Sequence, residues 1–538
     1  MYQALVWYRA DEFDKLKGSD LPLERSDISL PELWQSHARF APDKLAVVCG
    51  ERRETWSQLD AGMNRVANRL IRAGVGHGDK VAVVMANCVD MLYILYGIVK
   101  AGACVVPISM LLRAEQIAVL VKDSEAIALI AGDGPGALGE EFIGRLPSLR
   151  PDLKIGFGFD RPGWTAFSDW IADAPTTCPN VEHSPDDDFS IIYSSGTTGS
   201  PKGILHSHSA RCHWSYSNAL ELRLRRDSVA LVTTSLYSNG SWFMLLPPLF
   251  MGATIVILES FSPLALLRTI AAERVTHTFM VPTQFITTLA EPELDRTDLT
   301  SLQSVLSAGS PLWDSTKAEI RARFTTQLFE LYGFSEGFAT LIGPQDVFER
   351  AGSVGKPVLG FDLRILDDQG VEVAQGESGE IVGRGAGLMK EYFRKAAETE
   401  EVIWRDASGR GFVRSGDIGR LDADGFLYIL DRKKDMILSG GFNVFPKDIE
   451  AVVAQHPDVM DVTVIGIPHP KWGETPLAFV IARPGVTPVL DELREWCNQR
   501  LGKAQQLRQI ELRADFPRNA LGKVLKRVLR EPYWTRTQ

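Results

Sequence analysis

Apolar residues follow two alternating spacings from residue 30 to about residue 330. Thr55–Ala73 has the spacing of an amphipathic helix, whereas Lys80–Met85 and Cys104–Ile108 are short, largely β-branched apolar runs. Leu45–Cys49 is another such run, and the helical segment Leu30–Arg39 precedes it. Helices that alternate with short β-branched strands are typical of a parallel sheet covered by helices on both faces. We therefore predict an α/β fold for this region.

Two segments of this region need predictions of their own. Glu51–Glu54 is polar throughout and predicts a turn after the first strand. Ser228–Leu258 carries no charge, but Asn239, Gly240 and Pro247 interrupt it. A membrane-spanning helix needs about 20 predominantly apolar residues without such breaks. The uncharged segment therefore predicts a strand, a loop, a short helix and a second strand in a protein core, and no integral membrane segment is expected.

The spacing changes after about residue 350. Short strands at Leu363–Leu366, Gly379–Val382 and Phe426–Leu430 are joined by Asp/Gly turns, which predicts a small antiparallel, barrel-like unit. From Asp448 on, the predicted order is helix, strands, helix, strand and a basic tail. The charged string at residues 431–435 predicts a hinge between an N-terminal domain, residues 1–431, and a C-terminal domain, residues 432–538.

The composition fits a multidomain enzyme. A chain of 538 residues is too long for one ordinary core, and 45% hydrophobic with 23% charged residues is ordinary for a globular enzyme. The net charge of -10 gives no overall attraction to nucleic acid or anionic membranes, so no nucleic-acid partner is expected. The six cysteines form no CxxC pair and have no zinc-ligand spacing, and the N-terminus lacks the pattern of a signal peptide. We therefore expect a cytoplasmic protein, and the sequence leaves a homodimer open.

A loop rich in glycine and hydroxyl side chains follows the apolar strand Ile191–Tyr193. Its glycines let backbone N–H groups converge on phosphate oxygens, its hydroxyl groups add donors, and Lys202 adds charge. A flexible Gly/Ser linker does not follow a buried strand, and a Walker P-loop needs a lysine directly after its last glycine. We therefore predict a polyphosphate-binding loop of another pattern. It reads Ser194-Ser195-Gly196-Thr197-Thr198-Gly199-Ser200-Pro201-Lys202-Gly203.

This loop closely resembles the signature of the adenylate-forming enzymes, the superfamily of acyl-CoA synthetases, peptide-synthetase adenylation domains and firefly luciferase. Further motifs of that superfamily lie in its usual order within residues 30–530. The resemblance implies a large N-terminal domain with two parallel-type αβα sheets and a small β-barrel, followed by a small mobile α+β domain. It also implies that the protein binds ATP and Mg²⁺, with coenzyme A as a co-substrate.

Glu330–Glu336 resembles the Tyr-Gly-x-Thr-Glu motif of that superfamily, with serine in place of threonine. The resemblance implies that Tyr332 packs on adenine, that Ser335 contacts the α-phosphate and that Glu336 helps to hold Mg²⁺. The implied metal ligands are Glu336 and Thr198.

Two further segments resemble nucleotide-binding motifs. Ser307–Leu312 resembles the adenine-binding turn, although a helix cap fits it better when it is considered alone. Arg414–Asp417 resembles the motif whose aspartate accepts hydrogen bonds from the ribose hydroxyls, whereas on its own it fits a simple β-turn better. The implied ATP-binding residues are Ser194, Ser195, Gly196, Thr197, Thr198, Gly199, Lys202, Gly309, Ser310, Pro311, Glu330, Leu331, Tyr332, Gly333, Ser335, Asp417, Ile429, Arg432 and Lys523.

The C-terminal region resembles the mobile domain of these enzymes. Pro517–Arg527 resembles the motif that carries the catalytic lysine of adenylation, here Lys523, and Lys434 stands at the pivot position. Ser439–Val444 resembles the loop beside the pantetheine arm, and Trp472 lies in a stretch near the CoA nucleotide, where it either stacks on adenine or packs half-buried. The implied CoA residues are Gly440, Gly441, Phe442 and Trp472, and the implied catalytic residues are Lys523, Glu336, Lys202 and Ser335.

The acid-binding pocket has a weaker pattern. Ser228–Leu258 contains no Asp or Glu, which argues against an α-amino acid, because amino-acid-activating relatives carry an aspartate there for the ammonium group. Trp242 fits either the pocket or the core. The predicted pocket residues are Ser238, Asn239, Trp242, Ala308, Gly309 and Phe338.

The resemblance implies an acyl-CoA ligase that converts ATP, a carboxylic acid and CoA into acyl-CoA, AMP and pyrophosphate through an acyl-adenylate. We expect an aryl, alicyclic or medium-chain fatty acid. One alternative is an acyl-adenylating enzyme that loads a carrier protein. Another is a nucleotide-binding regulator without catalysis, which the joint presence of Lys202, Glu336, Asp417 and Lys523 opposes.

Overall fold

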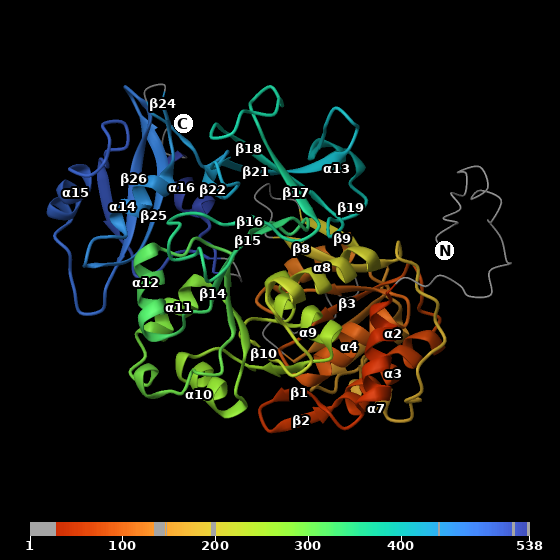
Figure 1. Ribbon diagram of the computed structural model, residues 1–538. Helices are drawn as coiled ribbons and strands as arrows, with labels where there is room; N and C mark the ends of the chain where they lie inside the picture. The colour runs from red at the N-terminus through yellow and green to blue at the C-terminus, as the bar shows by residue number, and fades with distance from the viewer. Residues whose placement is uncertain are drawn as a thin grey trace, which may run out of the picture.

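The computed structural model describes residues 28–133, 146, 148–194, 201–439, 442–518 and 522–534. These residues form two large sheets with helices, a small antiparallel sheet above them, and a C-terminal α+β unit (Figure 1). The α/β fold with a small C-terminal domain, predicted above, is confirmed.

The first large sheet has nine strands. Its central strands run parallel, and antiparallel strands close both edges. In spatial order the strands are β16 (Lys356–Pro357), β15 (Ala339–Ile342), β14 (Leu328–Gly333), β13 (Ser304–Ala308), β12 (His277–Met280), β10 (Val229–Val232), β11 (Thr254–Ile257), β1 (Leu45–Cys49) and β2 (Arg52–Thr55).

The turn predicted at Glu51–Glu54 is present only at its first residue, Glu51, and is wrong for the other three. Strand β2 occupies Arg52–Thr55 and pairs antiparallel with β1. Its charged side chains are accommodated because Arg52 Nε donates to Glu54 Oε1 at 2.7 Å, so the buried carboxylate has a partner. A polar edge strand is therefore stable where sequence polarity alone indicated a turn.

The second large sheet has eight strands. Strands β3 to β8 pair in parallel, whereas β9 runs antiparallel to both of its neighbours. In spatial order the strands are β19 (Glu391–Tyr392), β9 (Lys202–Ser207), β8 (Asp188–Ser194), β4 (Cys104–Pro107), β3 (Lys80–Val84), β5 (Ala128–Gly132), β6 (Lys154–Phe157) and β7 (Thr165–Ala166).

The largest cluster of buried apolar side chains contains residues of both sheets and of the helices α3 and α4. Every residue of α4 except Asp90 is buried, as expected for a helix that is apolar all round. The helices of this part are α2 (Leu30–Phe40), α3 (Trp56–Arg72), α4 (Val89–Lys100), α5 (Ala114–Asp123), α7 (Phe167–Ile171), α8 (His208–Glu221), α9 (Leu246–Met251), α10 (Pro263–Glu273), α11 (Pro282–Leu289) and α12 (Asp314–Arg323). The short 3₁₀ helix η3 (Asn239–Met244) and α9 lie between β10 and β11, which confirms the core segment predicted for Ser228–Leu258.

Among the described residues, no helix combines the length and the apolar composition that crossing a membrane requires.

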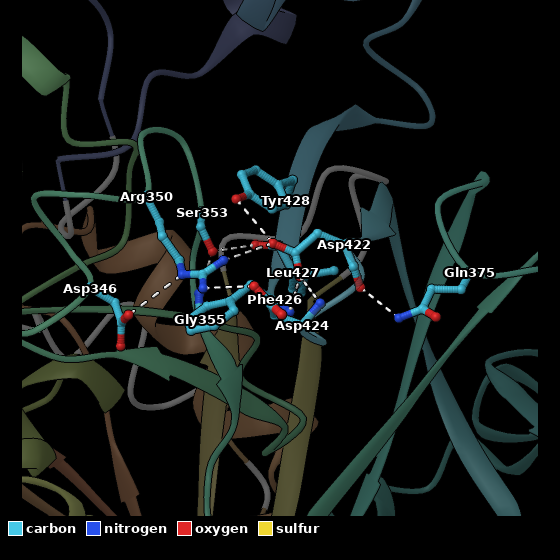
Figure 2. A network of polar contacts seen from close by, with 10 residues as sticks. All are labelled: Asp346, Arg350, Ser353, Gly355, Gln375, Asp422, Asp424, Phe426, Leu427 and Tyr428. Atoms are coloured by element: carbon cyan, nitrogen blue, oxygen red, sulfur yellow. Dashed lines mark hydrogen bonds and ion pairs between the residues drawn. The ribbon is translucent and has the colours of Figure 1, made fainter.

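The small sheet is antiparallel throughout. Its last hairpin is joined to the loop before β16 through Arg350, whose guanidinium lies 3.2 Å from Asp422 Oδ2 and 2.8 Å from Asp424 Oδ2 (Figure 2). Asp422 also accepts the backbone N–H groups of Asp424 and Phe426 and thereby closes the hairpin turn (Figure 2). The strands are β17 (Phe361–Leu366), β18 (Ser378–Gly385), β21 (Gly411–Leu421), β20 (Ile403–Arg405) and β22 (Leu427–Arg432), and α13 (Ala396–Glu401) precedes β20.

The C-terminal unit has a five-stranded sheet and its own core. Since β22 ends at Arg432 and the first strand of the new sheet begins at Ile437, the change of sheet falls within the predicted hinge segment. Two hydrogen bonds cross that segment at 3.0 Å, from Lys447 N to Asp431 Oδ2 and from Lys447 Nζ to the Ile429 carbonyl. The elements are β23 (Ile437–Ser439), β24 (Phe442–Val444), α14 (Pro446–Val453), β25 (Val459–His469), β26 (Gly473–Ala482), α15 (Leu490–Asn498), β27 (Gln509–Leu512) and α16 (Lys526–Trp534).

Buried histidines make the fold sensitive to acid. His208 is buried, its ring stacks 5.1 Å from that of His183, and neither ring nitrogen has a hydrogen-bond partner among the described residues. Burial lowers the pKa of His208 to about 3. The unfolded chain, with an ordinary histidine pKa of about 6.5, takes up the proton first as the pH falls. The free energy of unfolding therefore decreases as the pH falls from about 6.5 toward about 3.

We expect the His208→Phe variant to lose this acid sensitivity. Phenylalanine keeps the ring but cannot be protonated, and the described residues offer the histidine no hydrogen bond that would be lost. At pH 5 the variant should be more stable than the wild type by about 2 kcal/mol relative to their difference at pH 7. Urea unfolding at both pH values measures this, and the difference at pH 7 reports the packing change alone. Equal pH profiles for the two proteins would contradict the assignment.

Candidate active site

The carboxyl ends of β13 and β14 open at one edge of the nine-stranded sheet. These strands are parallel, with Ala308 opposite Leu331, so the segments that follow them lie side by side. The first segment turns at Gly309, whose φ of 94° is in the left-handed region that favours glycine. In open α/β sheets, ligands bind at this edge.

Asp417 connects this edge with the small sheet. Its Oδ2 accepts a hydrogen bond from the Tyr332 hydroxyl at 2.8 Å, and its Oδ1 lies 3.3 Å from Arg432 Nε. Burial, together with the Asp417 charge, raises the pKa of Tyr332 well above its usual value, so the phenol stays a donor. Three residues that sequence motifs placed in the ATP site therefore form one cluster.

Lys523 lies beside this cluster. Burial and the Arg432 charge lower the pKa of its ammonium group to about 7, and Asp417 and Asp435 act in the opposite direction. The preceding Gly522 has a φ of 73°, and a Cβ atom there would lie 3.2 Å from Thr283 Oγ1 of α11. The close approach of this glycine to α11 brings the C-terminal lysine to the N-terminal domain.

Glu336 and Lys202 share Tyr392 as a neighbour. The Tyr392 hydroxyl donates to Glu336 Oε1 at 2.6 Å, and Lys202 Nζ lies 4.7 Å from the centre of the Tyr392 ring. Sequence reasoning missed Tyr392, which comes from strand β19 and has no local pattern that marks it. The structure therefore brings the predicted phosphate-binding lysine and the predicted metal ligand to one side chain.

The residues at Glu336 fit a magnesium ion. Tyr392 uses one carboxylate oxygen, and a hard cation can be held by a single carboxylate together with phosphate oxygens. The described residues contain no group of three His, Cys, Asp or Glu side chains that would hold a metal ion without such help. The predicted second ligand, Thr198, lies outside the described residues.

Several predicted site residues lie outside the described part of the chain. The strand β8 ends at Ser194, and the described chain resumes at Pro201. The predicted residues in these gaps are Ser195, Gly196, Thr197, Thr198, Gly199, Gly440 and Gly441.

The other predicted adenine contacts line the same edge. Glu330 is buried and its Oε2 lies 2.6 Å from Lys317 Nζ of α12, so its carboxylate is bound within the protein. Leu331 is buried, and the Ile429 carbonyl accepts a hydrogen bond from Lys447 Nζ. Gly333 is the last residue of β14, Ser310 and Pro311 follow the end of β13, and all three reach the surface in part or fully.

The predicted acid-pocket residues have different surroundings. Ser238 is buried, and its Oγ has no hydrogen-bond partner among the described residues. Trp242 is fully buried, and its Nε1 donates to the Leu236 carbonyl at 2.8 Å. Phe338 is 1% exposed and packs in the small-sheet core, 5.8 Å from the Phe361 ring, whereas Ala308 faces the main core. Trp242 and Phe338 thus have structural packing roles, and their part in a pocket stays a prediction.

A buried polar cluster lies behind Asn239, and sequence reasoning missed it. Its centre is Arg211 of α8, which is 1% exposed. Arg211 Nη1 donates to Asn239 Oδ1 at 2.9 Å, Nε donates to Ser190 Oγ at 3.2 Å, and Nη2 lies 3.2 Å from His206 Nδ1. A single arginine within a helix has no sequence signal that would reveal these partners.

The predicted CoA residues lie at the surface of the C-terminal unit. Phe442 on β24 and Gly473 on β26 pair with Ser439 of β23 from opposite sides, so Phe442 and Trp472 flank the same strand. Phe442 is 67% exposed and Trp472 is 46% exposed. The predicted pivot, Lys434, lies between β22 and β23, and its carbonyl accepts a hydrogen bond from Arg530 Nη1 at 3.4 Å.

Known proteins match this chain over most of its length. Residues 34–393 match the family AMP-binding enzyme, and residues 448–523 match the AMP-binding enzyme C-terminal domain. A long-chain-fatty-acid–CoA ligase of Mycobacterium tuberculosis is 34% identical over 502 residues, which cover 89% of this chain and 93% of that protein. A fatty acid–acyl-carrier-protein ligase of Streptomyces coeruleorubidus is 30% identical over 518 residues, with coverage of 94% and 96%.

A solved structure is similar as well. The anthranilate CoA ligase in complex with anthranoyl-AMP has a TM-score of 0.86 and 27% sequence identity, and the match covers 96% of this chain and 99% of that one. The fold, the order of the motifs and these matches agree. The chain therefore belongs to the AMP-binding enzyme family, whose members are the adenylate-forming enzymes.

Proposed function

We propose that the protein is an acyl-CoA ligase that activates a carboxylic acid as an acyl-adenylate and transfers the acyl group to the thiol of CoA. The cluster of Asp417, Tyr332 and Arg432 beside Lys523 carries this proposal. It combines acceptors for ribose hydroxyls with a cation for phosphate charge, and these groups come from three parts of the chain.

The first half-reaction would form the mixed anhydride. A carboxylate oxygen of the acid attacks the α-phosphorus of ATP, the P–O bond to pyrophosphate breaks, and pyrophosphate departs opposite to the attacking oxygen. Positioning and charge stabilisation dominate such a transfer. Lys202 and Lys523 would supply positive charge, and Asp417 would hold the ribose. A magnesium ion at Glu336 would neutralise phosphate charge when it is bound.

The second half-reaction would form the thioester. The CoA thiolate attacks the acyl carbon, and AMP leaves with the anhydride oxygen. Lys523 serves the first step and the CoA-binding surface serves the second, so both must reach the same carbon in turn. We propose that the C-terminal unit rotates about Lys434 between the two steps.

The acid is proposed to be an aryl, alicyclic or medium-chain fatty acid. The segment with Ser238 and Trp242 is apolar and carries no acidic side chain, which suits an apolar acyl group. One relative is a long-chain-fatty-acid–CoA ligase and one similar structure is an anthranilate CoA ligase, so aliphatic and aryl acids are both represented among similar proteins.

A carrier-protein thiol is the second candidate acceptor, because one relative is a fatty acid–acyl-carrier-protein ligase. The exposed pair Phe442 and Trp472 favours CoA, since an exposed indole can stack on the CoA adenine. ATP and CoA as substrates, together with six cysteines that form no disulfide bond, fit the expected cytoplasmic location.

A panel of carboxylic acids, with AMP release measured with and without CoA, tests the proposed function directly. We expect CoA-dependent AMP release with at least one aryl, alicyclic or medium-chain fatty acid. The best acid then shows which kind of acyl group the pocket accepts. Release that depends on a carrier protein and not on CoA would favour the second acceptor.

Lys523→Ala should lower acid-dependent ATP–pyrophosphate exchange by at least about 10²–10³-fold, because a preorganised charge at the transferring phosphate is lost. ATP binding, measured by calorimetry, should stay nearly unchanged. Lys503→Ala removes an exposed lysine of the same unit and should leave exchange at the wild-type rate. Full exchange in the Lys523→Ala variant would remove the proposed role of this lysine.

The pH dependence of adenylation should report the Lys523 pKa. Since this pKa is about 7 and the protonated form carries the useful charge, kcat/KM for ATP in the exchange reaction should fall as the pH rises above about 7. Lys523→Arg keeps the charge at all these pH values and should remove the decline. The same decline in both proteins would mean that another group titrates.

Trp472→Ala should raise the KM for CoA about tenfold, because stacking of a base on an aromatic side chain is worth ~1–3 kcal/mol. Acid-dependent exchange, which does not need CoA, should be unaffected and serves as the control. An unchanged KM for CoA would show that Trp472 is only a packing residue.

A further inference from the structure

Arg211 differs from the other buried basic side chains in the described residues. Three lysine or arginine side chains are less than 5% exposed, namely Lys100, Arg211 and Lys317. Lys100 lies 2.5 Å from Asp60 Oδ1, and Lys317 lies 2.6 Å from Glu330 Oε2. Arg211 has no carboxylate partner in the described part of the chain, and its three side-chain partners there, Ser190, Asn239 and His206, are neutral.

A buried charge without an opposite charge is costly unless its hydrogen bonds are well satisfied. The three partners of Arg211 lie on three different elements: Ser190 on β8, His206 on β9 and Asn239 at the start of η3. The guanidinium also lies 4.8 Å from the centre of the Trp242 ring, which limits its tilt. A planar group with donors in a fixed fork can hold three elements at set distances, which a lysine cannot do.

The connection continues from His206 to the metal-binding motif. His206 is buried, and its pKa is far below the usual value, so the ring is neutral. A neutral ring that accepts from Arg211 at Nδ1 carries its proton at Nε2. Next to His206 on β9, the Leu205 carbonyl accepts a hydrogen bond from Lys390 N at 2.8 Å, and Met389 N donates to the Glu336 carbonyl at 2.7 Å. Arg211 is thus joined, through His206 on β9 and the segment at Met389 and Lys390, to the backbone of Glu336.

We propose that Arg211 is a positioning residue that holds the proposed acid-binding wall at Asn239 in register with the segment at Ser335 and Glu336. The inference rests on the proposed function, because the register matters only if an acid carboxylate must meet the α-phosphate between these segments. An error of about 1 Å in such a register can lower a rate by about 10²-fold. Arg211 itself is placed behind the pocket wall and contacts no reacting atom.

The test compares Arg211→Met with Arg211→Lys in acid-dependent ATP–pyrophosphate exchange. We expect both variants to lose about 10²-fold in kcat, because neither carries the fork, while the KM for ATP stays near the wild-type value. Recovery of the wild-type kcat in Arg211→Lys would show that charge alone suffices and would overturn the positioning role. A KM effect without a kcat effect would overturn it as well.

Lys100→Met is the matched control. Lys100 is as deeply buried as Arg211 but pairs with Asp60 of α3, away from the proposed site. We expect this variant to unfold at a lower temperature and to keep the wild-type kcat per folded molecule. A fall in its kcat equal to that of Arg211→Met would show that any loss of a buried cation has the same effect, which contradicts the proposal.

If an Arg211 variant does not fold, a second measurement tests the positioning role of Arg211. Asn239→Ala and His206→Leu each remove one partner, and both partners contact Arg211. If Arg211 connects them, the double variant should lose less activity than the product of the two single losses. Fully multiplicative losses would contradict the connection. If the wild-type protein shows no ATP–pyrophosphate exchange with any acid, the proposed function is contradicted. If the wild type is active and Arg211→Met is equally active, only the positioning role is contradicted.

Discussion

The hydrogen bond between Tyr332 and Asp417 is the contact on which the arrangement of the site depends. Tyr332 ends a parallel strand of the nine-stranded sheet, and Asp417 lies on β21 of the small sheet. Arg432, opposite Asp417 on β22, adds an ion pair within the predicted hinge segment, at the last residue of the strand. One buried carboxylate therefore fixes the large lobe, the small sheet and the start of the C-terminal unit relative to one another.

This cluster also sets the electrostatics of Lys523. Lys523 is buried and lies next to Arg432, and both the burial and the positive charge lower the pKa of its ammonium group. Asp417 limits the fall, so the ammonium group stays within reach of protonation near neutral pH. The negative charge of a bound nucleotide would favour the protonated form further, which couples substrate binding to the charge that the first half-reaction needs.

The sequence predicted the helices and strands better than the contacts between residues on different elements. Helical spacing in Thr55–Ala73 corresponds to α3, and the β-branched run at Lys80–Met85 corresponds to β3, because spacing reports which face of an element is buried. It failed at Glu51–Glu54, where cross-strand and side-chain contacts stabilise a polar edge strand. Tyr392 and Arg211 were missed because their partners lie on other elements, and no local pattern encodes such contacts. Residues 195–200 of the phosphate loop and the Gly440–Gly441 pair lie outside the described residues, so their roles stay predictions.

Lys447 has a consequence for the speed of the enzyme. It bonds to Asp431 and to the Ile429 carbonyl, whereas its own helix α14 belongs to the unit beyond the hinge. If that unit swings between two half-reactions, both bonds must open in every cycle, and each is worth ~1 kcal/mol net. These two bonds would slow the rotation of the C-terminal unit away from its first orientation more than they slow the chemical steps. The rate at which α14 separates from Asp431 and Ile429 would then limit the turnover number of the enzyme.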